Sequence, residues 1–133
     1  EDLKAAEGAD AAFVFGDFNE PSHRDWTVRT AAAGRHPLAV HFPTARAVEA
    51  QGVVDAYRVS HPDEVAKPGY TWEAIARPAG VEVQHDRIDY VFARGASLAV
   101  EQARIVGEKA PEADVVVTPW PSDHRAVVAT VRF

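Results

Sequence analysis

Short hydrophobic runs separated by turn-forming residues alternate along the chain, which predicts strands mixed with short helices. The run at residues 11–15 (AAFVF) is too short for a helix and rich in aromatic and branched side chains, so it predicts a buried strand. Partial alternation of apolar and polar residues predicts another strand over residues 97–106. The apolar residues from 126 to 133 predict a strand that closes the fold.

Two further apolar segments, on either side of a proline- and glycine-containing connection, predict a hairpin. One strand starts at residues 70–72 (YTW), the other covers residues 82–93, and residues 77–80 connect them. The period of two in the second strand places Arg87, Asp89 and Val91 on one face. A buried charge is costly unless it is paired, so the carboxylate of Asp89 needs a partner. That partner is either an arginine, such as Arg87, or a histidine.

Turn residues also mark the ends of short helices. Pro21 breaks the chain, and Ser22 or Asp25 can cap a helix that runs to about residue 33 and places Trp26 against the core. The same signals predict a short helix over residues 45–50 capped by Thr44, a helical turn over residues 53–58, an irregular segment over residues 36–42 and a loop over residues 61–69.

Composition limits the class of protein. With 133 residues, 47% of them hydrophobic, the chain is a single domain at most, which buries roughly two-thirds of its unfolded surface. A net charge of -6 argues against binding a polyanion over a broad surface, but it does not exclude a local cationic pocket. Cysteine is absent, which excludes disulfides and thiol chemistry, and nothing resembles a signal peptide or a membrane span. Methionine is absent even at position 1, which suggests a chain that begins partway through a longer protein.

Polar residues at the ends of two predicted strands are candidates for chemistry. Asp17 and Asn19 follow the first strand and share one side if the extended conformation continues, although such residues most often form a turn. His124 stands beside Asp123, just before the last strand, where a scaffold holds a side chain rigidly. His61 and Asp63 have no second pair of metal ligands nearby, so we interpret them as solvated loop residues.

Four motifs, in this order and spacing, resemble the endonuclease/exonuclease/phosphatase superfamily, whose fold is that of deoxyribonuclease I. The motifs are residues 16–19 (GDFN), 70–72 (YTW), 86–92 (DRIDYVF) and 122–124 (SDH). The resemblance covers nearly the whole chain. It implies an α/β (α+β) fold, a two-sheet sandwich of mainly antiparallel strands with helices on the outer face.

The resemblance also implies a metal-dependent phosphoester hydrolase. Asp17 would orient or deprotonate the attacking water, Asn19 would hydrogen-bond a phosphoryl oxygen, and Asp89 would bind a ring nitrogen of His124. Asp123 and Asp17 would lie at a Mg²⁺ or Mn²⁺ ion, a hard cation that prefers oxygen ligands. The substrate stays open among nucleic acid, a lipid headgroup and a soluble phosphate ester. We name His23 and Arg77 as candidates for contact with it.

The chain departs from the family pattern in length. Family members are about twice as long, and their metal-binding glutamate lies in an N-terminal half that none of Glu1, Glu7 or Glu20 matches. We therefore expect residues 1–133 to be the C-terminal half of the domain, inactive in isolation. Its apolar sheet face should pair with the missing half or with a second copy. The alternative is a catalytically silent interaction module that kept the fold.

Overall fold

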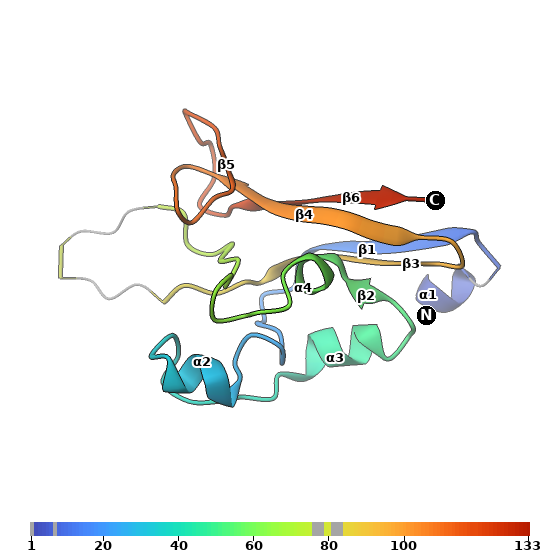
Figure 1. Ribbon diagram of the computed structural model, residues 1–133, viewed down its shortest axis with the longest axis horizontal. Helices are drawn as coiled ribbons and strands as arrows, with labels where there is room; N and C mark the ends of the chain where they lie inside the picture. Colours follow the sequence, from blue (N-terminus) through green and yellow to red (C-terminus); the bar gives the residue numbers. More distant parts are fainter. Residues whose placement is uncertain (1, 7, 76–78, 81–83) are drawn as a thin grey trace.

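A computed structural model describes residues 2–6, 8–75, 79–80 and 84–133 (Figure 1). Within these residues, no helix is long and apolar enough to cross a membrane. The elements in chain order are α1 (Asp2–Ala5), β1 (Ala11–Asp17), α2 (Val28–Ala32), α3 (Pro43–Glu49), β2 (Val54–Asp55), α4 (Ala56–Ser60), β3 (Asp89–Gly95), β4 (Ala99–Gly107), β5 (Val115–Val116) and β6 (Ala126–Arg132).

The strands form two small sheets, one with the order β1-β3-β2 and the other with the order β5-β4-β6. All pairs are antiparallel except β4 with β5. The two sheets meet through contacts between β3 and β6, and α4 packs against β4 and β3. Figure 1 shows how these elements are arranged. In Figure 1, α2 and α3 lie on the side of β1 and β3 away from β4 and β6. The predicted fold of mainly antiparallel strands with few helices is confirmed, with the strands divided between two sheets.

Alternation in β1 turns one row of side chains to the core and the other to the outside. Val14 packs against a buried cluster that contains Tyr90 and Phe92 of β3. Phe13 and Phe15 point the other way and are 42% and 75% exposed. The strand predicted at residues 11–15 is confirmed. The prediction that it is buried holds for one face only, because in the described part of the chain the other face of β1 does not meet the core.

A second cluster lies between α4 and the other sheet. Tyr57 of α4 packs on Ala103 and Ile105 of β4, with Val127 of β6 at the margin. The strands predicted at residues 97–106 and 126–133 are confirmed as β4 and β6. Tyr57 of α4 is therefore the large side chain at the centre of this second cluster.

The first predicted helix is present but shorter than expected. α2 starts after Thr27, whose side chain accepts a hydrogen bond from the backbone of Thr30 and forms a capping box with it. The predicted caps, Ser22 and Asp25, lie before the helix. Asp25 is buried in an ion network instead. Trp26 is buried, as predicted.

The next two helix predictions are partly confirmed. α3 starts at Pro43 with Phe42 at the cap position, and no side chain of that residue can cap the helix. The predicted cap, Thr44, lies inside α3, and its backbone N–H donates to the carboxylate of Glu20. The helical turn predicted over residues 53–58 is split into β2 and α4. Asp55 causes this split, since its carboxylate accepts from the backbone of Tyr57 and Arg58 and caps α4.

The predicted hairpin is reduced to isolated bridges. Trp72 bridges Asp86 and His124, and β3 starts only at Asp89. Both Thr71 and Trp72 donate their backbone N–H groups to the carbonyl of Asp86, at 3.0 and 2.8 Å, which interrupts a regular ladder. The hydroxyl of Thr71 accepts from the backbone N–H groups of Ile88 and Asp89. Residues 82 and 83 of the predicted strand, and residues 77 and 78 of the predicted connection, lie outside the described residues.

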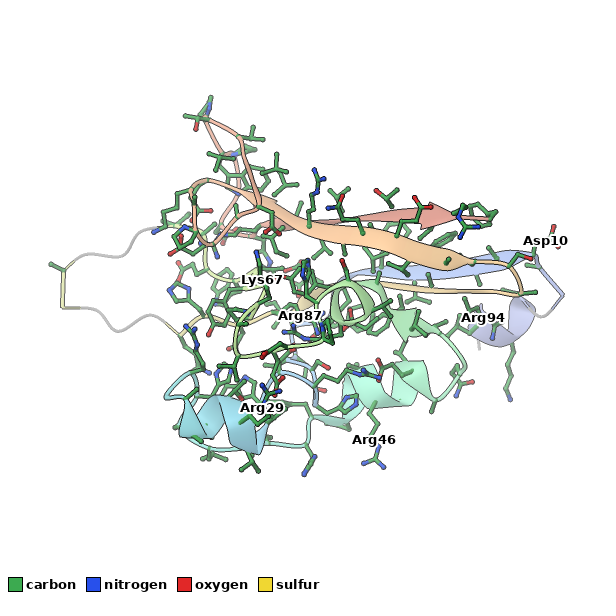
Figure 2. The ribbon with its side chains drawn as sticks, viewed as in Figure 1. Asp10, Arg29, Arg46, Lys67, Arg87 and Arg94 are labelled. Atoms are coloured by element: carbon green, nitrogen blue, oxygen red, sulfur yellow. The ribbon has the colours of Figure 1, made fainter. Side chains whose placement is uncertain are left out.

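A buried ion network lies beside α4. Asp25 accepts from Arg58 Nε at 2.7 Å and from Arg87 Nε at 3.0 Å, and Arg87 also pairs with Asp55 at 2.7 Å. The guanidinium of Arg87 lies 4.6 Å from the ring centroid of Tyr90. Figure 2 shows Arg87 inside the molecule near α4, whereas Arg46 points away from the ribbon. The network ties α4 to the segment just before β3.

Candidate active site

The end of β1 holds Asp17 and Asn19 against each other. The backbone N–H of Asn19 donates to one carboxylate oxygen of Asp17 at 2.7 Å, and its side-chain amide donates to the other at 3.1 Å. Asn19 has φ 50°, a left-handed conformation that asparagine tolerates better than most residues. The expected convergence of carboxylate and carboxamide is therefore present, produced by a local turn after the strand.

Strand pairing places a second carboxylate beside the first. Asp17 and Asp89 are direct partners in the antiparallel pair of β1 and β3. Side chains of such partners emerge on the same face of a sheet. The face that carries Phe13 and Phe15 thus ends in two acidic side chains.

His124 completes this group from the segment before β6. Its Nδ1 lies 2.9 Å from Oδ2 of Asp89, and the two side chains are 26% and 19% exposed. The histidine is therefore the partner of Asp89. Arg87, the alternative, is not on the face of Asp89 as the alternation predicted: it is buried and pairs with Asp25 and Asp55, since the chain joins the ladder only at Asp89.

Opposing effects act on the pKa of His124. Burial lowers it, but the hydrogen bond and charge of Asp89, with smaller contributions from the charges of Asp17 and Asp123, raise the pKa above its ordinary value of 6.5. The imidazolium form is thereby favoured.

A cleft of about 470 Å³ opens at this group. The ring of Trp72 lies 4.8 Å from that of His124, and Ile88 and Asp86 form part of the wall. We gave these three residues no role from the sequence. Alternation placed Asp86 and Ile88 opposite Asp89, which holds only inside a regular strand. The motifs at residues 70–72 and 86–92, which contain all three residues, were the signals that pointed to the site.

Of the other predicted site residues, one lines the cleft at His124, one lines a different cleft, and one lies outside the described residues. Asp123 is exposed and lines the same cleft. His23 lies 3.4 Å from Glu49 and lines a different cleft with Arg24 and Thr27. Burial lowers the pKa of His23, with the charge of Glu49 acting against it. Arg77 lies outside the described residues.

The group has the ligand chemistry of a divalent-cation site. Asp17, Asp89 and His124 each place a ligand atom within 4.8 Å of the others. Among the described residues, no other group of three or more acidic, histidine or cysteine side chains is arranged in this way. Nδ1 of His124 is already hydrogen-bonded to Asp89. The carboxylates of Asp17 and Asp89 are therefore the groups of this set that can supply oxygen ligands. Oxygen ligands suit Mg²⁺ and Mn²⁺. His61 contacts the carbonyl of Ala103 and lies outside this set.

Comparison with known proteins gives relatives of greater length. An uncharacterized protein of Caenorhabditis elegans is 30% identical over an alignment of 128 residues, which covers 91% of this chain and 40% of the relative. The structure is similar to that of an endonuclease/exonuclease/phosphatase family protein from Leptotrichia buccalis, with a TM-score of 0.57 and 19% identity over 98% of this chain and 40% of that one. The chain thus spans about two-fifths of each.

The structural similarity supports the fold, since its sequence identity is too low to carry more. The sequence pattern of the Endonuclease/Exonuclease/phosphatase family, in contrast, matches residues 1–124, which include all four motifs. The chain belongs to the endonuclease/exonuclease/phosphatase family.

Proposed function

We propose that the protein is a metal-dependent phosphoester hydrolase whose active site includes Asp17, Asn19, Asp89 and His124. The observation that carries the proposal is the 2.9 Å contact between Asp89 and His124, next to the paired Asp17 and Asn19. These residues come from three separate segments, and a purely structural role requires no such convergence at an open cleft.

Asp17 is the group that orients or deprotonates the attacking water. It is exposed and held by both donors of Asn19, so its direction is fixed while it stays accessible. The amide of Asn19 uses one of its two hydrogens on Asp17. The other can donate to a phosphoryl oxygen.

His124 stabilises charge on the phosphoryl group. Asp89 occupies Nδ1, which leaves Nε2 for a non-bridging oxygen. Because Asp89 favours the imidazolium, this nitrogen donates a charge-assisted hydrogen bond as the oxygen gains charge. Removing Asp89 would therefore change both the orientation and the charge of the ring.

The carboxylates of Asp17 and Asp89 are the groups that would hold a Mg²⁺ or Mn²⁺ ion. Asp123, which the sequence also predicted at the ion, lines the same cleft but is not in the set whose ligand atoms lie within 4.8 Å of one another. When bound, the cation supplies Lewis-acid stabilisation of phosphoryl oxygens. No glutamate of this chain matched the metal-binding glutamate of the family in the sequence, so we propose that activity belongs to a protein of the length of its relatives, called the full-length protein below.

The exposed face beside the site supports the proposal that this chain packs against the rest of the domain, or against a second copy of itself. Phe13 and Phe15, on one face of β1, are 42% and 75% exposed. Apolar side chains gathered on one sheet face are typical of an interface.

The experiment that tests the function is a metal-dependence assay. The full-length protein is incubated with bis-p-nitrophenyl phosphate after EDTA treatment, then with Mg²⁺ or Mn²⁺ restored. We expect hydrolysis only with the cation. Hydrolysis that persists in EDTA would contradict the proposed chemistry, and no hydrolysis of any phosphoester with either cation would favour the silent interaction module.

A further inference from the structure

A second cleft, separate from the one at His124, lies between α2 and the segment before β3. Its volume is about 610 Å³, and its walls include Arg35, His36, Tyr70, Gln84 and His85. None of these side chains is acidic. On a chain with a net charge of -6, a cleft walled by a guanidinium, two imidazoles, a phenol and an amide is a local concentration of hydrogen-bond donors.

The walls also carry stacked rings. Tyr70 and His85 lie 5.5 Å apart at 29°, and His36 meets Tyr70 edge-on at 6.4 Å. On its other side His36 stacks on Trp26 at 4.3 Å and 14°. Stacking fixes the imidazole and phenol rings in place, so they form a preorganised wall against which a planar ring can bind.

Two groups in the cleft have capacity for a ligand. Nδ1 of His85 is buried and has no hydrogen-bond partner among the described residues. Arg35 is exposed and donates to the carbonyl of Val65 and to the phenol oxygen of Tyr70, which leaves the rest of its five donors for an anion. Burial raises the pKa of Tyr70, and the charge of Arg35 acts against this rise, which places the guanidinium near the phenol.

The cleft borders the candidate active site through Asp86. This residue directly follows His85 and also lines the cleft at His124. Its carboxylate is already bonded, to Trp26 Nε1 at 2.8 Å and to Gln84 at 3.2 Å. The segment of residues 70–72 also connects the two clefts, because Tyr70 lines the cleft of Arg35 and Trp72 lines the cleft at His124.

We infer that the cleft of Arg35, Tyr70 and His85 binds a planar aromatic ring that carries an anionic group, as a subsite for the part of the substrate beyond the phosphate that is hydrolysed. The ring packs on the wall of Tyr70 and His85, and the anion accepts from Arg35. The inference rests on the proposed function only for the link to substrate. Binding itself is independent of hydrolysis.

The test measures binding of adenosine monophosphate to the full-length protein in EDTA by calorimetry, with adenosine and inorganic phosphate as separate ligands. We expect the nucleotide to bind at least about 10-fold more tightly than either part, because base stacking on an aromatic side chain contributes about 1–3 kcal/mol. Tyr70→Leu and Arg35→Gln should each weaken binding about 10-fold.

Arg46→Gln is the matched control, since it removes an exposed arginine of α3 outside the cleft (Figure 2). It should leave nucleotide binding unchanged. Binding should also survive His124→Gln, which separates this subsite from the catalytic cleft. The inference is overturned if the nucleotide does not bind, if Arg35→Gln and Tyr70→Leu leave its affinity unchanged, or if His124→Gln abolishes binding. Absence of hydrolysis by the wild-type protein with Mg²⁺ or Mn²⁺, alongside a normal binding series, would instead count against the proposed function.

Discussion

Asp89 and His124 are 35 positions apart in the sequence, and their side chains meet at 2.9 Å across the junction of the two sheets. Asp89 opens β3, opposite Asp17, and His124 precedes β6. The contact therefore depends on both sheets being in place. It links the fold to the proposed chemistry, because it orients the imidazole toward the cleft.

The Asp89–His124 pair should make stability depend on pH. The folded pKa of His124 is raised, so the stabilisation is fully present below the unfolded value of about 6.5 and is lost as pH rises through the folded pKa. Asp89→Asn should lower the pKa of His124, since it removes the two largest contributions that raise it. An NMR titration of the histidine ring in EDTA measures this.

Asp123→Asn is the control for that titration. Its carboxylate makes the smallest of the contributions that raise the pKa of His124, so this variant should lower the pKa less than Asp89→Asn does. An unchanged pKa in Asp89→Asn would show that the pair does not form in solution.

Arg87 should contribute strongly to stability. Its side chain is buried between Asp25 and Asp55, and removing one member of a buried ion network leaves uncompensated charge. Arg87→Met should lower the free energy of unfolding by about 3–5 kcal/mol, as measured by urea denaturation. Arg46→Gln on exposed α3 should change it by less than about 0.5 kcal/mol. Equal effects of the two substitutions would contradict the network.

Local pattern was sufficient for much of the fold. Short apolar runs identified β1, β4 and β6, and the cost of an unpaired charge led to a partner for Asp89. Asp25 shows where local pattern fails. It looked like a helix cap, but its partners Arg58 and Arg87 are 33 and 62 positions away and no local signal reveals them. The same holds for Thr71, whose hydroxyl bonds across 17 and 18 positions and replaces the ladder expected there.

The exposed face of β1 should drive association of this chain when it is expressed alone. Burying a phenylalanine side chain contributes about 1.5–3 kcal/mol, so Phe15→Ser should weaken self-association at least about 10-fold. Sedimentation equilibrium measures the constant. Val59→Ser is the matched control, because Val59 is 49% exposed on α4, away from this face. A chain that stays monomeric at all concentrations, before any substitution, would contradict self-association.

The most direct test of the proposed active site is the turnover of bis-p-nitrophenyl phosphate by the full-length protein with Mn²⁺, compared between wild type and His124→Gln. The exposed His41→Gln serves as control. Removing a positioned charge-stabilising group should lower turnover at least about 100-fold in His124→Gln, with a near-normal melting temperature and full turnover in His41→Gln. Wild-type turnover in His124→Gln would contradict the account.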